Sequence, residues 1–277
     1  MALFLSRLMS LALILVGALS ASGCQAQNQR SEVSGTDKAM AETKIYFDRE
    51  ALVFDGAITP DSASKFAEMA QSIEPGSTLK IRSSSGSPAA ALAIADIVIE
   101  KKMDLQVTDL CLAYCTMIFA AAKNKKVDDL SIVAFHSSVK SQNDIIKMSQ
   151  KFKDQEFLIE IEGKEMDFFR KTGISIGILN KADDLLQVVC VGNKTDRGRL
   201  SDGTKLAYGA HYIGWVPSLY QMRALGIKNI TGYWPESPDE LDMLVKKHFA
   251  PGVKMRFVRD LSLIPDKTPE LPPCITQ

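Results

Sequence analysis

The chain has 277 residues, with 33 lysines and arginines balanced by 33 aspartates and glutamates. No basic stripe is present, which excludes the usual features of a nucleic-acid partner. The three histidines stand at no metal-ligand spacing, and glycine-rich phosphate loops are absent, so we expect neither a metal nor a cofactor. Short basic clusters at 123–126 and 246–247 are predicted to be solvated surface.

The N-terminus has the pattern of an export signal. Arg7 precedes an apolar run at 8–19, and about 12 residues are too few to span ~30 Å of hydrocarbon as a helix. Small residues before Cys24 resemble a bacterial lipobox, in which Cys24 is acylated, although Ala21 stands where leucine is preferred. Because Gln25 is not an inner-membrane retention signal, we expect an outer-membrane lipoprotein on the periplasmic face. Plain secretion and an uncleaved anchor are the alternatives.

The sequence divides into four predicted parts. These are a signal segment with its lipobox at 1–24, a polar tether at 25–43, an α/β domain at 44–185 and a C-terminal α+β extension at 186–277. Between 44 and 136, strand-like runs alternate with helical patterns, which indicates a mostly parallel sheet with crossover helices. Strands are expected at 45–47, 52–54, 79–81, 105–107 and 131–136, and helices from Pro60, Pro88 and Ala113.

One long helix is expected at 141–172, because apolar residues recur at spacings of three, four and seven. The stripe from Ile145 to Phe169 is expected to be buried, either on the body or on another subunit. The last third is predicted to hold a loop or hairpin at 192–209, helices at 216–225 and 238–249, and an edge strand at 253–258.

Four cysteines remain once Cys24 is set aside, an even number in an oxidising compartment. We expect one disulfide between Cys190 and Cys274 and another between Cys111 and Cys115. Buried free thiols are the alternative.

Three short segments stand in a characteristic order. Residues 81–86 are Ile-Arg-Ser-Ser-Ser-Gly, 111–116 are Cys-Leu-Ala-Tyr-Cys-Thr, and 132–136 are Ile-Val-Ala-Phe-His. Together they resemble the proteolytic subunit of the Clp protease (ClpP) and its exported bacterial relatives in the ClpP/crotonase superfamily. The resemblance covers about half the chain, and it implies an α/β spiral of β-β-α units with a long handle-type helix.

The first segment corresponds to the family's oxyanion turn, and the second corresponds to the segment that holds its nucleophile. The family motif I-N-S-P-G-G forms the oxyanion turn; here Gly86 keeps its second glycine, while Ser85 replaces the first. The exported relatives carry C-x-S-A-C-T, in which the serine attacks the substrate. Ala113 stands at that position, and a methyl group cannot attack a carbonyl.

The third segment implies the rest of a triad. His136 corresponds to the family's general base, and Asp183, in preference to the adjacent Asp184, corresponds to the aspartate that orients it. The family's handle helix meets other subunits, so the resemblance also implies self-association.

The leading interpretation of function is a pseudoprotease that binds a peptide or an envelope protein. One alternative is an active hydrolase with a displaced nucleophile, either Cys115 or a serine of 83–85. Others are crotonase-type chemistry with Tyr114 as acid or base, and a purely structural envelope lipoprotein.

Overall fold

The structure is a computed structural model that describes residues 42–136, 138–139, 155–186, 190–191, 206–207, 212–249 and 256–259. The chain divides into two compact units, Met1–Ser34 and Gly35–Gln277, and all of these residues belong to the second. Cys24 and Cys274 lie outside them, as does the predicted signal segment. Within the described part of the chain, no helix has the length and apolar character needed to cross a membrane.

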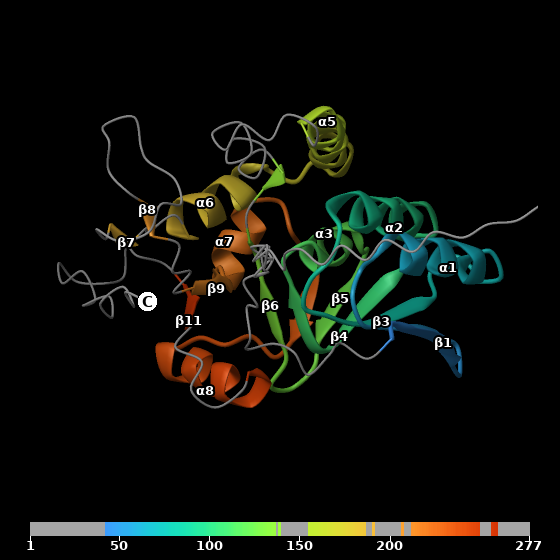
Figure 1. Ribbon diagram of the computed structural model, residues 1–277. Helices are drawn as coiled ribbons and strands as arrows, with labels where there is room; N and C mark the ends of the chain where they lie inside the picture. Colours follow the sequence, from blue (N-terminus) through green and yellow to red (C-terminus); the bar gives the residue numbers. More distant parts are fainter. Residues whose placement is uncertain are drawn as a thin grey trace, which may run out of the picture. The chain divides into compact units, whose positions relative to one another are not determined.

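A seven-stranded sheet forms the centre of the fold, in the order β1-β2-β3-β4-β5-β10, with β6 also paired to β4 (Figure 1). Its strands are β1 (Lys44–Asp48), β2 (Ala51–Asp55), β3 (Thr78–Ser83), β4 (Asp104–Leu112), β5 (Lys125–Val127), β6 (Ile132–Ala134) and β10 (Ile230–Gly232). Only the β1–β2 pair of this sheet is antiparallel. Two small sheets pair β9 (Tyr212–Trp215) with β11 (Arg256–Val258), and β7 (Cys190–Val191) with β8 (Leu206–Ala207).

Helices connect the strands and cover the sheet. They are α1 (Pro60–Ala70), α2 (Pro88–Glu100), α3 (Cys115–Ala121), α5 (Gln155–Thr172), α6 (Gly177–Leu186), α7 (Leu219–Ala224) and α8 (Pro238–His248). Thr59 and Ser87 cap α1 and α2, and each helix begins at the proline from which the sequence predicts it. Figure 1 shows α1, α2 and α3 together on one face of the sheet.

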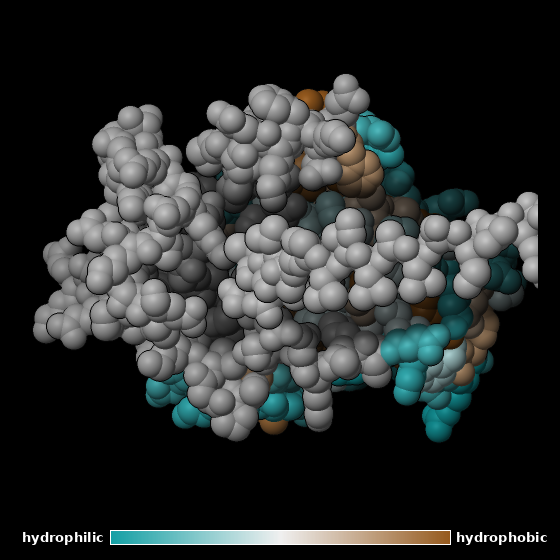
Figure 2. Space-filling view, in the orientation of Figure 1, coloured by the Kyte–Doolittle hydropathy of each residue, from teal (hydrophilic) through white to brown (hydrophobic). Residues whose placement is uncertain are grey.

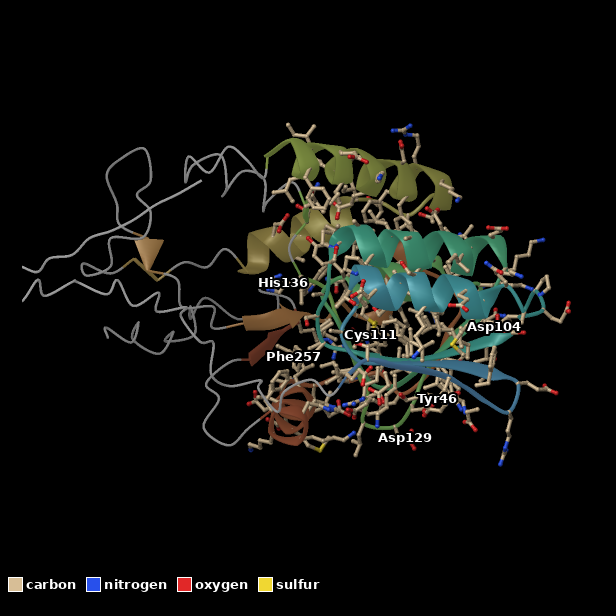
Figure 3. The ribbon with its side chains drawn as sticks, turned by 45° about the vertical axis from the view of Figure 1, so that its right-hand side comes forward. Tyr46, Asp104, Cys111, Asp129, His136 and Phe257 are labelled. Carbon is tan, nitrogen blue, oxygen red and sulfur yellow. A yellow bond between two sulfur atoms is a disulfide. The ribbon has the colours of Figure 1, made fainter. Side chains whose placement is uncertain are left out.

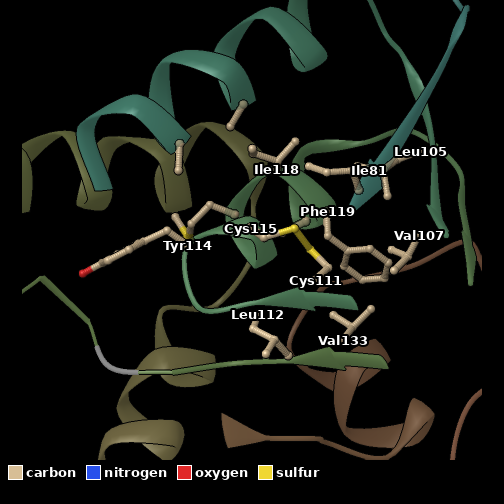
Figure 4. Packing of buried hydrophobic residues seen from close by; sticks show 14 of the residues in the cluster. Ile81, Leu105, Val107, Cys111, Leu112, Tyr114, Cys115, Ile118, Phe119 and Val133 are labelled. Carbon is tan, nitrogen blue, oxygen red and sulfur yellow. A yellow bond between two sulfur atoms is a disulfide. The ribbon is translucent and has the colours of Figure 1, made fainter. Parts of the chain in front are cut away.

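The core lies between that face and the three helices. Strand residues of alternating position, such as Ile81, Leu105 and Val107, are fully or almost fully buried there and pack near Ile118 and Phe119 of α3 (Figure 4). The residues between them point to the opposite face, where Lys80 pairs with Asp48 and Arg82 with Asp55, each at 2.6 Å. Figure 2 shows hydrophilic residues over α8 and over the end of the sheet near β1.

The strand β5 was not expected from the sequence. It overlaps the basic cluster 123–126, and Lys125 is 4% exposed, so the prediction of a solvated cluster is wrong for this residue. The Lys125 ammonium donates to the carbonyl oxygens of Ala122 (2.6 Å) and Lys228 (3.2 Å). Burial lowers the pKa of Lys125 to about 8.

The last third of the chain completes the central sheet. β10 adds beside β5, and an isolated antiparallel bridge joins Phe135, next to β6, to Trp215 of β9. A Cβ on Gly214 would lie 2.9 Å from the Ala134 Cβ and the Phe135 carbonyl oxygen, so β9 lies directly against β6. Helices α7 and α8 lie within the ranges predicted for them.

The long helix differs from the expected one in its buried face. Residues 140–154 lie outside the described part, and the described helix is α5. Of the predicted stripe, Phe169 is buried, whereas Ile159 and Met166 are 53% and 44% exposed, so these two do not pack on the body of the same chain. The buried face follows a stripe shifted by one position, made of Leu158, Ile161, Glu165 and Phe168. Self-association through α5 stays a prediction.

Candidate functional site

The position of the missing nucleophile lies in a sharp turn between β4 and α3. Ala113 has a φ of +51°, a left-handed conformation that is uncommon for a residue with a Cβ. Its N–H donates to the Ala134 carbonyl oxygen (3.2 Å), and its own carbonyl accepts the Thr116 hydroxyl (2.6 Å). The helix expected from Ala113 therefore begins two residues later, at Cys115. We call residues 111–115 the elbow.

A disulfide closes the elbow on its buried side. Cys111 at the end of β4 bonds to Cys115 at the start of α3, with 5.2 Å between the Cα atoms, and both residues are fully buried (Figure 4). This confirms one of the two expected disulfides. The other, between Cys190 and Cys274, falls outside the described residues. Since the Cys115 sulfur is bonded, Cys115 is not a free thiol that could act as a displaced nucleophile.

The predicted oxyanion turn follows β3 and lies beside the elbow, because Ser83 stands opposite Cys111 in the β3–β4 register. A Cβ on Gly86 would lie 2.4 Å from the Ile58 Cβ and 2.5 Å from its carbonyl oxygen, so only glycine fits. The Ser83 side chain is buried and donates to the Ser85 carbonyl oxygen (3.1 Å). Ser83 thus faces the core, whereas Ser85 is exposed.

His136 stands two residues beyond β6 and is half-buried. Leu112 and Ala134 are register partners in the parallel β4–β6 pair, so the elbow and His136 lie at the same edge of the sheet. Figure 3 shows His136 at this edge, near β9 and α6. Burial lowers the pKa of the His136 imidazole, and the negative charge of Asp183 opposes that shift.

Asp183 lies on α6, and its carboxylate holds the backbone just after His136. It accepts the Ser138 N–H (3.1 Å) and the Ser138 hydroxyl (2.7 Å). Ser138 is 1% exposed. The structure therefore places Asp183 close enough to His136 for its charge to act on the imidazole. It also adds Ser138 to the site, a residue that the sequence analysis missed and that no local pattern indicates.

Glu165 of α5 is a second carboxyl group at this place that the sequence analysis missed. It is 1% exposed, and its two carboxyl oxygens accept the N–H of Val139, at 3.4 and 3.2 Å from the Val139 nitrogen. Burial, followed by the charges of Asp183 and Glu162, raises the pKa of Glu165 to about 8 against the opposing effect of the Val139 N–H. The available signal was a glutamate placed within the apolar stripe of a helix.

The site thus combines an imidazole, two carboxyl groups and a buried hydroxyl beside an elbow that carries a methyl group. Among the residues that the structure describes, no cluster of three or more histidine, cysteine, aspartate or glutamate side chains could hold a metal ion. The groups present can accept, donate and move protons, but the methyl group of Ala113 cannot attack a carbonyl.

Similarity to known proteins is found among solved structures. No family model and no curated protein sequence matches the chain. Solved structures of the ClpP and enoyl-CoA hydratase/isomerase classes are similar to it at low sequence identity. At the identities and TM-scores found, the similarity concerns the fold alone.

Among the particular proteins, ClpP1 from Listeria monocytogenes is 15% identical with a TM-score of 0.41, covering 68% of this chain and 92% of that one. A single-site mutant of the same ClpP1 is 16% identical with a TM-score of 0.41, covering 69% of this chain and 94% of that one. An enoyl-CoA hydratase/isomerase from Marinobacter aquaeolei is 9% identical with a TM-score of 0.36, covering 74% of each chain.

Proposed function

We propose that the protein is a pseudoprotease, a ClpP-like fold that binds a peptide or an envelope protein without cleaving it. The observation that carries the proposal is Ala113, whose methyl group stands in a left-handed elbow at the same sheet edge as His136. A catalytic triad acts as a unit, so without the nucleophile the remaining groups contribute mainly binding and orientation.

The elbow around Ala113 is a strained turn that a disulfide closes. A left-handed alanine costs about 1–2 kcal/mol, and here the disulfide and the hydrogen bonds of Ala134 and Thr116 offset that cost. The glycine-tight turn at Gly86 adjoins it. A turn of fixed shape that lacks a nucleophile suits binding of an extended chain rather than its hydrolysis.

The proposed location follows from the N-terminal sequence. A lipobox-like Cys24 would anchor the mature protein through lipid to the periplasmic face of the envelope, where an exported peptide or protein is the natural ligand. Intact-mass analysis of membrane-fractionated protein should find lipid on Cys24. A Cys24→Ala protein that remains wholly membrane-bound would contradict the anchor.

The decisive experiment restores the nucleophile. The wild-type chain should hydrolyse neither casein nor small peptide esters above background, and serine-directed phosphonates should not label it. Ala113→Ser should give weak esterase activity that disappears when His136→Ala is added. Adding Ser85→Gly to Ala113→Ser should raise the activity, since one oxyanion donor is typically worth roughly 10²–10³ in rate.

A matched control places the new hydroxyl on α3, the helix that follows the elbow. Ala121→Ser at the end of α3 should stay inactive. Clear hydrolysis by the wild-type chain that is abolished by Ser85→Ala would show that the nucleophile has moved. Hydrolysis that is abolished by Tyr114→Phe would favour crotonase-type chemistry, and either result overturns the pseudoprotease proposal.

A further inference from the structure

Among the described residues, Ser138 and Val139 are the next two after His136, and carboxyl groups on two different helices bind them. Asp183 of α6 accepts both the N–H and the hydroxyl of Ser138, and Glu165 of α5 accepts the N–H of Val139. Ser138 and Val139 are almost fully buried. Successive backbone groups next to the imidazole are therefore fixed by carboxyl groups distant in sequence.

We propose that Glu165 is a positioning residue for His136. It fixes the backbone that follows His136 by accepting the N–H of Val139, and the gain or loss of its proton changes the electrostatic potential at His136 and Asp183. This role goes beyond the proposed binding function, because it concerns the internal state of the site and needs no ligand.

The contacts of Glu165 explain why its charge matters. Val139 faces it from the segment after His136, Asp183 faces it from α6, and Glu162 adds a charge from its own helix. Among the described residues, the charged groups that act on Glu165 are the carboxyl groups of Asp183 and Glu162, and no cation offsets them. A carboxylate here would place a second negative charge beside Asp183 in a buried, weakly screened place.

Two states of the site follow. With a pKa of about 8, Glu165 is neutral at pH 7, and Asp183 is then the carboxylate that acts on His136. Above pH 8 Glu165 becomes an anion, which strengthens its hydrogen bond to Val139 but repels Asp183. The environment of the His136 side chain should therefore change when Glu165 ionises, in addition to any change from titration of the imidazole itself.

Nuclear magnetic resonance of the full chain between pH 5 and pH 9.5 tests this. In the wild type, the Val139 amide shift should titrate with a midpoint near pH 8, and the His136 ring signals should show a second inflection at the same pH. Glu165→Gln provides a neutral acceptor of the same shape, so both inflections should vanish while the Val139 shift stays near its low-pH wild-type value.

Two further variants separate positioning from folding. Glu162→Gln, on the same helix, should keep both inflections. Glu165→Leu removes the acceptor, and the Val139 amide should exchange with solvent at least tenfold faster. If the leucine variant does not fold, the glutamine variant decides alone. A Val139 amide that does not titrate near pH 8 in the wild type, a His136 ring that fails to follow it, or an inflection that survives in Glu165→Gln would overturn the proposal.

Discussion

The two sides of the site are stabilised in different ways. On the nucleophile side, backbone hydrogen bonds and the Cys111–Cys115 disulfide hold the elbow, and none of these contacts involves the side chain of Ala113. On the base side, the buried Glu165 of α5 and the half-buried Asp183 of α6 hold the backbone after His136. A covalently held turn can keep its shape after losing its reactive group, whereas a buried polar cluster depends on the protonation of each member.

The largest expected effect lies on the base side, in the dependence of stability on pH. Because the pKa of Glu165 is raised to about 8 from an ordinary 4.5, its contribution is fully present below about pH 4.5 and is lost as the pH rises through 8. The free energy of unfolding should fall by about 1.4 kcal/mol per pH unit in that window from this group. Urea unfolding at several pH values measures it.

The matching variant is Glu165→Gln, in which this decline with pH should be absent. Glu162→Gln should retain it, since Glu162 only adds charge from the same helix. A wild-type unfolding free energy that stays as flat between pH 5 and pH 8 as that of Glu165→Gln would show that Glu165 is ionised in the folded state.

The next effect concerns the hydroxyl that binds Asp183. Ser138→Ala should lower the free energy of unfolding by roughly 1.5–3 kcal/mol, the range for a hydrogen bond to a charged group, because the half-buried Asp183 carboxylate loses a donor. Thermal and urea unfolding at pH 7 measure the loss. Ser64→Ala, which removes an exposed hydroxyl on α1, is the control and should change little. Equal losses in both variants would contradict a special role for Ser138.

The elbow should respond differently, through its covalent bond. Replacing both Cys111 and Cys115 with alanine should cost about 2 kcal/mol, since the disulfide closes a loop with a sequence separation of only 4. The two sides are independent if the titration of Val139 near pH 8 persists in this variant. Disappearance of that titration would show that the elbow also shapes the base side.

The smallest effect is expected at Ala113 itself. Ala113→Gly relieves a left-handed conformation, which favours the folded state by about 1–2 kcal/mol, and it frees the unfolded chain by about 0.4–1 kcal/mol. A net gain of about 0.5 kcal/mol should appear in urea unfolding. A loss of more than about 1 kcal/mol would mean that the Ala113 methyl group makes packing contacts that matter.

Sequence analysis succeeded where the signal is local or matches a familiar motif. The caps Thr59 and Ser87 and the apolar run of α2 specify their helices within a few residues of chain. Resemblance supplied His136 and Asp183, and the structure brings these two together. In contrast, the bonds of Ser138 and Glu165 join residues 45 and 26 positions apart, which no periodicity reveals.

Other differences arise where tertiary contacts override local preference. Residues from Ala113 onward have helical composition, yet the hydrogen bonds to Ala134 and Thr116 hold a left-handed turn there. β5 is short and contains two lysines, so nothing in its sequence favours burial. It becomes a central strand only because β4 and β10 pair on both sides of it.

Because β10 comes late in the sequence, its position affects how the chain folds during synthesis. Thr231 hydrogen-bonds to Lys125 across 106 residues, so a nascent chain exposes the outer edge of β5 until this last strand of the central sheet emerges. During that interval the Lys125 ammonium also lacks its bond to the Lys228 carbonyl. Burial of that charge is thus coupled to synthesis of β10, and a fragment ending before Lys228 should stay a substrate for chaperones and quality-control proteases.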